Sequence, residues 1–179
     1  WATHGEPNTQ NAHPHSDSAG NFSLIHNGII ENHYAIKEYL TGKGIEFSSD
    51  TDSEVLVQFI GYIYSTKKMN FYDTVRTALK EVVGAYGILI ICKDEPDRII
   101  AARNGSPLVI GLGKGENFIG SDASAIMEHT RNILYLDDGE IAEVNKGDYV
   151  IKHIDHDNEI IKQTKEIEYN LEQIEKGNY

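Results

Sequence analysis

The stretch His26-Asn27-Gly28 holds residue types that can stabilise a developing negative charge. A glycine lets backbone N–H groups approach a ligand, because it has no Cβ in the way. The side-chain amide of Asn27 adds a second donor, and two donors that converge on one point form an oxyanion hole for acyl transfer. An ordinary Asn-Gly turn after an apolar strand at 22–25 is the alternative. The motif alone favours the turn, because Asn-Gly turns are common.

A second group of residues, Asp50, Asp52 and Glu54, alternates as at the start of a calcium-binding loop. Val55 stands where that loop needs a glycine, so calcium is not expected. Thr51 and Glu54 instead predict a capping box at a helix start. Asp52 then lies where the helix dipole favours an ionised carboxylate, which leaves an anion able to bind an ammonium group. The residues alone favour capping, with ligand binding as the alternative.

The other candidate sites for a metal or cofactor are weak. Four histidines, at positions 4, 13, 15 and 26, have no cysteine beside them and no metalloprotease spacing, so structural histidines are the better interpretation. The stretch 111–116, GLGKGE, fits neither a dinucleotide fingerprint nor a Walker motif and predicts a hairpin turn. Cys92 ends an apolar run and is predicted to be a core residue rather than a nucleophile. No metal and no cofactor are expected.

The elements that must position these residues fall into two halves. After a polar, turn-rich start at 1–21, helical periodicity predicts a helix from about Asn32 to Leu40, with Asn32 as its cap. Further helices are expected within 48–65 and 70–84. Beyond Gly84, short apolar runs separated by turn residues predict an antiparallel meander, with strands buried on both faces and a short helix within 122–130.

Bulk composition excludes several classes of protein. The 179 residues, 40% hydrophobic and 25% charged, suit one globular domain. A net charge of −12 argues against a nucleic-acid partner, because phosphate binding needs a basic face. No apolar run is long enough to span a membrane, and no signal-peptide pattern is present. The single cysteine is compatible with a reducing compartment, so a cytoplasmic location is expected.

Seven stretches, in order along nearly the whole chain, carry a resemblance: WATHGEP, NAHPH, HNGIIENH, SDTDSEV, GAYGILI, ARNGSPLVIGLGKGENFIGSD and LDDGEIAEV. They resemble the glutaminase domain of the glutamine–fructose-6-phosphate aminotransferases, which are class II glutamine amidotransferases. The first two stretches look closer to bacterial forms. The resemblance implies an α+β fold of the N-terminal-nucleophile hydrolase type, with antiparallel sheets sandwiched by helices.

The resemblance also implies a mechanism. In the family, an N-terminal cysteine attacks the side-chain amide of L-glutamine, and its own α-amino group serves as the base. A glutamyl thioester forms, and ammonia leaves for a sugar-phosphate isomerase domain of the same parent chain. That domain aminates fructose 6-phosphate to glucosamine 6-phosphate, in amino-sugar synthesis.

Six residues receive roles by position from this resemblance. Asn27 and Gly28 would form the oxyanion hole, and Asp52 would hold the α-ammonium group of glutamine. The other three would line the glutamine pocket or, in the case of the tryptophan, the route of ammonia: Thr3, His4 and Trp1.

The printed sequence departs from the family in what it lacks: the N-terminal cysteine, the arginine before Trp1 and the isomerase domain. Residues 1–165 are therefore expected to form a partial glutaminase domain without its N-terminal segment, and 166–179 a tail or linker. By itself this chain is expected to be inactive. A sister class II amidotransferase with another acceptor, or a non-catalytic binding or assembly domain, are the alternatives. A homodimer is left open.

Overall fold

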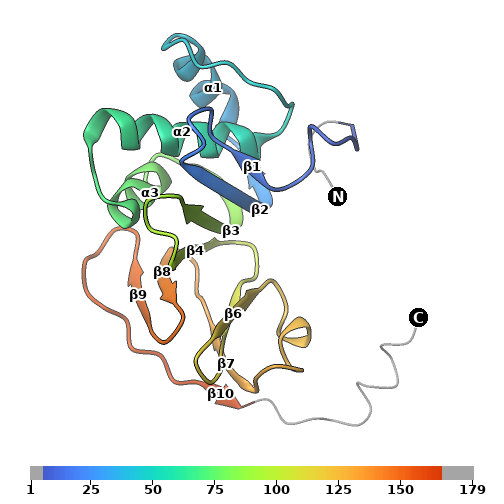
Figure 1. The fold of residues 1–179 in the computed structure, drawn as a ribbon, viewed down its shortest axis with the longest axis vertical. Coiled ribbons are helices and arrows are strands. Elements are labelled where there is room, and N and C mark those ends of the chain that lie inside the picture. The colour runs from blue at the N-terminus through green and yellow to red at the C-terminus, as the bar shows by residue number, and fades with distance from the viewer. Residues whose placement is uncertain (1–5, 167–179) are drawn as a thin grey trace.

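The computed structural model describes residues 6–166 (Figure 1). Every strand pair in it is antiparallel. One sheet has six strands in the order β1-β2-β3-β4-β8-β9: His15–Ser16, Phe22–Ile30, Gly84–Cys92, Arg98–Asn104, Glu140–Asn145 and Tyr149–His153. The other has four, in the order β10-β7-β5-β6: Lys165–Glu166, Asn132–Tyr135, Val109–Leu112 and Asn117–Gly120. The predicted α+β class is confirmed.

The helices predicted from periodicity are present as α1 (His33–Thr41), α2 (Asp52–Lys67) and α3 (Phe71–Leu79). The capping role predicted for Asn32 is wrong. Its side chain makes no cap hydrogen bond; it donates to the carbonyl of Glu81 and accepts from the backbone N–H of Val83. Asn32 therefore ties the start of α1 to the segment between α3 and β3, because tertiary partners compete with the local cap.

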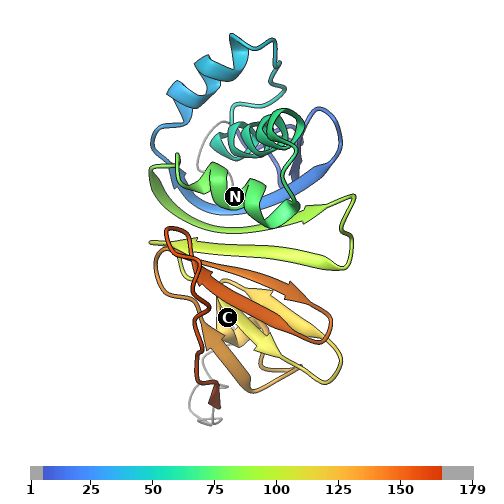
Figure 2. The same ribbon diagram turned by 90° about the vertical axis from the view of Figure 1, so that its left-hand side faces the viewer.

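The layers are clear in Figure 2, where the helices cover one face of the six-stranded sheet and the four-stranded sheet lies beyond the other. On β4, Ile100 and Ala102 join the core under the helices, while Ala101 joins the core shared with the second sheet. A strand with a core on each side needs apolar residues on both faces. This confirms the prediction from the continuous apolar runs.

The single meander expected after Gly84 is wrong in one respect: its strands divide between two sheets. β3 and β4 are neighbours, but β5, β6 and β7 belong to the second sheet, and the chain returns to pair β8 with β4. The chain leaves the six-stranded sheet after β4, in the stretch Gly105-Ser106-Pro107. Proline cannot donate a backbone hydrogen bond to a continuing strand ladder.

Two smaller predictions have different outcomes. The hairpin turn at 111–116 is confirmed, because Leu112 pairs with Asn117 and the N–H of Gly113 donates to the carbonyl of Glu116. The helix expected within 122–130 is only a 3-10 turn, Ala123–Ala125.

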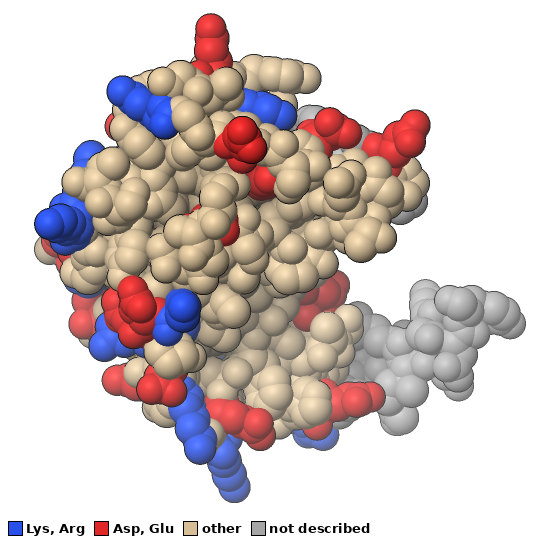
Figure 3. Space-filling view, turned by 45° about the horizontal axis from the view of Figure 1, so that its top comes forward, with Lys and Arg blue, Asp and Glu red and all other residues tan. Residues whose placement is uncertain are grey.

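None of the helices in the described part of the chain has the length and apolar character needed to cross a membrane. Acidic and basic side chains are interspersed on the face drawn in Figure 3.

Candidate functional site

The Asn-Gly turn predicted at residues 27–28 is wrong. β2 runs through both residues, and its register with β3 is unbroken: Asn27 lies opposite Gly87, and Gly28 opposite Tyr86. Gly28 has φ +135°, and a Cβ built there would lie 2.0 Å from the carbonyl oxygen of Ala85. The glycine is therefore required by the close approach of β3, not by a turn.

Alternation along β2 places the side chains of His26 and Asn27 on opposite faces. His26 is buried, with its side chain on the helix side, whereas Asn27 is exposed. Asn27 lines a cavity of about 330 Å³ whose wall is drawn from both sheets, which we call the inter-sheet cavity. Its other lining residues include His13, Gly87, Leu108 and Ser121.

The side chain of Asn27 makes no hydrogen bond within residues 6–166. An amide that points at a cavity without a protein partner can bind a ligand oxygen at no cost in broken protein hydrogen bonds. The inter-sheet cavity is also within the range of volumes typical of small-molecule sites. The position of the Asn27 side-chain amide therefore suits a hydrogen-bond donor to a bound substrate.

Asp52 is held at the first turn of α2, next to β2. The side chain of Thr51 caps this helix by accepting from the N–H of Glu54 at 3.2 Å. Asp52 is 2% exposed, and its Oδ2 accepts from the backbone N–H of Ile30 at 2.8 Å. The carboxylate is therefore anchored two residues beyond Gly28, on the helix side of the strand, and it does not line the inter-sheet cavity.

The loop before α2 is fixed by Glu54. Its carboxylate accepts from the backbone N–H and hydroxyl groups of Ser48 and Ser49 at 2.6–2.9 Å. Burial alone would raise the pKa of Glu54, but these hydrogen bonds outweigh burial and lower it. Only half of the predicted capping box is therefore present, because the Glu54 side chain turns to the serines instead of the N–H of Thr51, which donates to Ser49 Oγ.

A set of buried and part-buried polar contacts near the start of α2 was not predicted. Ser53 Oγ lies 3.2 Å from His13 Nε2 and 3.0 Å from His26 Nδ1. His15 Nε2 lies 3.1 Å from the Thr51 hydroxyl. The interpretation of these histidines as hydrogen-bonded is confirmed for positions 13, 15 and 26. Partial burial, together with the neighbouring His15 and His26, lowers the pKa of His13.

The signal that would have revealed this network is the period of two in β2. It puts His26 on the same face as Leu24 and Ile30, which pack under the helices, and a histidine on a core face needs a polar partner. Its partner comes from α2, a choice that the sequence spacing does not determine. One bound glutamine would require Asn27, Gly28, Asp52, Thr3 and His4 to converge on one pocket. Thr3 and His4, like Trp1, lie outside the described residues, so this convergence stays a prediction; of the described residues, Asn27 lines the inter-sheet cavity and Asp52 does not.

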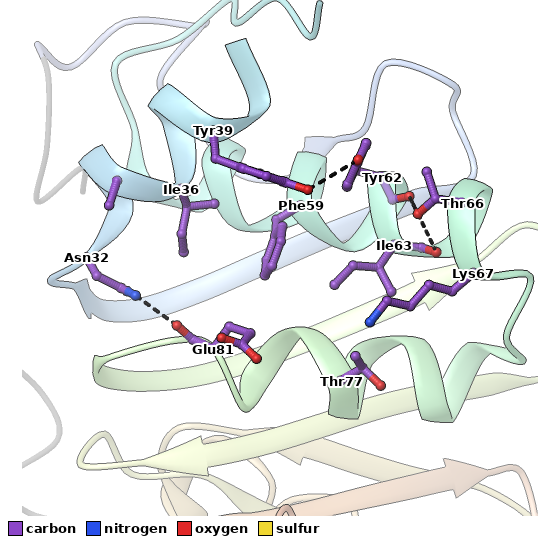
Figure 4. A pocket seen from close by; sticks show the side chains of 11 residues that line it. Asn32, Ile36, Tyr39, Phe59, Tyr62, Ile63, Thr66, Lys67, Thr77 and Glu81 are labelled. Carbon is purple, nitrogen blue, oxygen red and sulfur yellow. Dashed lines mark hydrogen bonds between the residues drawn. The ribbon is translucent and has the colours of Figure 1, made fainter. Parts of the chain in front are cut away.

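A larger hollow of about 420 Å³ lies between the helices and is drawn in Figure 4. Its floor is apolar, from Ile36, Phe59 and Ile63, and the hydroxyls of Tyr39 and Tyr62 meet across it at 3.3 Å. None of the described site residues predicted from the sequence lines it. The inter-sheet cavity is therefore the better candidate site.

The chain belongs to the glutamine amidotransferase domain family, because the family model described as "Glutamine amidotransferase domain" matches residues 6–128. Two similar proteins, from Chlorobaculum tepidum and Bacteroides thetaiotaomicron, are both named glutamine–fructose-6-phosphate aminotransferase (isomerizing). They are 52% and 51% identical to this chain over 180 residues and cover all of it. The chain spans 29% of the length of each.

A solved structure has a similar fold: glutamine phosphoribosylpyrophosphate amidotransferase from B. subtilis, complexed with ADP and GMP. Its TM-score is 0.70 at 25% identity, over 86% of this chain and 34% of that chain. The fold predicted from the motifs, that of the N-terminal-nucleophile amidotransferases, is thereby confirmed.

Proposed function

We propose that this chain is the glutaminase part of a glutamine–fructose-6-phosphate aminotransferase, which releases ammonia from L-glutamine. The observation that carries the proposal is the Asn27 amide, which faces the inter-sheet cavity without a hydrogen-bond partner in residues 6–166. The high identity to proteins named as such aminotransferases supports the same assignment.

Asn27 and Gly28 would supply the oxyanion hole in this proposal. Attack on the glutamine side-chain amide turns its carbonyl oxygen into an oxyanion, and donors fixed before the reaction stabilise that charge without reorganisation. Strand pairing on β3 fixes the backbone of both residues, so the donors are held by the sheet rather than by a mobile loop. This rigidity supports a role in the transition state.

Asp52 would hold the α-ammonium group of glutamine. Its carboxylate is almost fully buried and is oriented by the N–H of Ile30. An ion pair in a site with little water is stronger than one at the surface, provided that both charges are also hydrogen-bonded. Thr3 and His4 would complete the glutamine pocket, and Trp1 would lie beside the route of ammonia.

The rest of the parent protein would supply the acceptor chemistry. The chain spans 29% of the relatives' length, which leaves room for a sugar-phosphate isomerase domain in the same parent chain. Ammonia from this chain would there convert fructose 6-phosphate to glucosamine 6-phosphate. We propose residues 1–165 as the glutaminase part and 166–179 as the link toward that domain.

A polypeptide of residues 1–179 alone should not hydrolyse glutamine. Acyl transfer needs a nucleophile beside its base. The one thiol in the printed sequence, Cys92, is 2% exposed, and burial raises its pKa. Incubation of this polypeptide with glutamine should therefore release no glutamate. Release that disappears in the Cys92→Ala variant would contradict the expectation.

The parent protein tests the whole proposal. With glutamine alone it should form glutamate, and with fructose 6-phosphate added it should also form glucosamine 6-phosphate, measured by mass spectrometry. Glutamate without an amino sugar would favour a sister amidotransferase with another acceptor. No glutamate under either condition would favour a non-catalytic binding or assembly role.

A further inference from the structure

Ser53, the second residue of α2, joins two histidines from distant parts of the chain. The residue is 3% exposed, and its Oγ lies within hydrogen-bond distance of His13 Nε2 and His26 Nδ1. His13 lines the inter-sheet cavity, and His26 directly precedes Asn27 on β2. One hydroxyl therefore links the cavity wall to the strand that carries the proposed oxyanion donor.

Because the Ser53 hydroxyl has only one proton to donate, it restricts which ring nitrogens of His13 and His26 carry a proton. A serine hydroxyl has one proton to donate and can accept at its lone pairs. His26 Nδ1 also lies 3.9 Å from Asp52 Oδ1, so a proton on that nitrogen is favoured by the carboxylate. The Nδ1–H of His26 then donates to Ser53 Oγ, and Ser53 donates its proton to a bare Nε2 on His13. The lowered pKa of His13 agrees with this neutral form.

The hydroxyl also competes with the carboxylate for the N–H of His26. The Nδ1 atom of His26 is 3.0 Å from Ser53 Oγ but 3.9 Å from Asp52 Oδ1, so the hydroxyl takes the shorter contact. Hydrogen bonds to a charged acceptor are stronger than those to a neutral one. Without the hydroxyl, the same N–H would turn toward Asp52 and compete with any ammonium group for that carboxylate.

We propose that Ser53 is a positioning residue for glutamine, whose hydroxyl accepts the N–H of His26 and so keeps that N–H from competing with an ammonium group for the Asp52 carboxylate. This role rests on the function proposed above. It concerns binding more than chemistry, because Asp52 is proposed to hold the α-ammonium group, whereas Asn27 is proposed to donate to the reacting carbonyl oxygen. Loss of the hydroxyl should therefore raise KM for glutamine and leave kcat little changed.

The test uses the full-length parent enzyme and compares Ser53→Ala and Ser53→Thr with wild type. In Ser53→Ala, KM for glutamine should rise about tenfold, the scale of one lost hydrogen-bonding group, with kcat within about threefold of wild type. Ser53→Thr keeps a hydroxyl and should restore KM to within about threefold of wild type. KM for fructose 6-phosphate should not change in either variant.

Thr74→Val is the matched control, because Thr74 is also buried and its hydroxyl donates to the carbonyl of Asn70, the residue before α3, away from the cavity lining. It should lower the melting temperature as Ser53→Ala does, yet leave KM for glutamine unchanged. An unchanged KM in Ser53→Ala, or an equal rise in both variants, would overturn the role of Ser53 while leaving the proposed function intact. A wild-type enzyme that forms no glutamate would overturn both.

Discussion

The dipeptide Asn-Gly stands at residues 27–28 and again at 104–105, and the structure uses it in two different ways. Asn27 and Gly28 lie inside β2, paired residue by residue with β3. Asn104 ends β4, and Gly105 follows with φ +74°, in the left-handed region typical of a turn. The same dipeptide therefore lies within a strand at the first position and at the end of a strand at the second.

The neighbours of the two dipeptides explain the difference. The side chain of Asn104 donates to the carbonyl of Gly84 at 2.7 Å, and the N–H of Gly105 donates to the exposed Asp138 at 2.8 Å. These contacts tie the end of β4 to β3 and to the segment before β8. At the first dipeptide the asparagine amide faces a cavity, and the nearby carboxylate, Asp52, is buried. Asn104 and Gly105 therefore make contacts within the fold, whereas Asn27 lines a cavity.

The largest contrast is expected between the two glycines. A Cβ at Gly28 would meet the backbone oxygen of Ala85 at 2.0 Å, whereas one at Gly105 would meet the Ala85 Cβ at 2.9 Å and the Ala85 Cα at 3.5 Å. Gly28→Ala should therefore lower the free energy of unfolding by about 4 kcal/mol or more, because β3 must move. Gly105→Ala should cost about 1–3 kcal/mol, from its positive φ. Urea unfolding of the parent protein measures both; equal losses would mean that β3 yields easily.

Substitutions of Asn27 and Asn104 should affect different properties, catalysis at the first and stability at the second. Asn27→Ala should lower glutamine turnover by about 10²-fold or more, as for a lost oxyanion donor, with little loss of stability. Asn104→Ala should lower the free energy of unfolding by about 1 kcal/mol and leave turnover within about twofold, because it loses a structural hydrogen bond. Glutamate release and thermal unfolding of the two variants test this. A turnover for Asn27→Ala near that of wild type would remove it from the oxyanion hole.

The two aspartates extend the contrast to binding. Asp52→Asn keeps the shape of the side chain but removes the charge, so KM for glutamine should rise about 10- to 100-fold, the scale of a charged hydrogen bond. Asp138→Asn should leave KM unchanged, because that exposed carboxylate serves Gly105 and Arg103. Steady-state kinetics over a range of glutamine concentrations gives both values. Similar KM values for the two variants would argue against an ammonium site at Asp52.

Much of the fold could be predicted from periodicity, because each helix and strand had a clear period and clear ends. The positions of the three helices and the buried end of β3 at Cys92 followed from local patterns. The division of the later strands between two sheets did not, because period two identifies a strand but not its partner. The Asn32 contacts were equally hidden, since they join segments about fifty residues apart.

The candidate site was predictable only in part, for a related reason. Residue types at 26–28 indicated oxyanion donors, but the conformation that presents them depends on β3, more than fifty residues away in sequence. The helix start at Asp52 was local and was predicted correctly. The bridge from Ser53 to His13 and His26 needs three segments at once, and no spacing along the chain encodes it.

The smallest effect is expected at the far end of the same strand pair. Cys92 lies opposite Phe22, five residues along β2 from Asn27, which is about 17 Å at the rise of an extended strand. Burial raises the pKa of its thiol, although hydrogen bonds from the backbone N–H groups of Asp94 and Glu95 act in the opposite direction. Less thiolate is then present near pH 8 than for an exposed cysteine, and the folded protein shields the thiol from reagents.

Cys92→Ala should therefore keep glutamine turnover within about twofold and lower the free energy of unfolding by about 1 kcal/mol. Peptide mass spectrometry after iodoacetamide treatment should find Cys92 unmodified in the folded parent protein and modified in urea. Rapid alkylation in the folded state, or a turnover reduced tenfold, would show that this end of the strand pair also takes part in the chemistry.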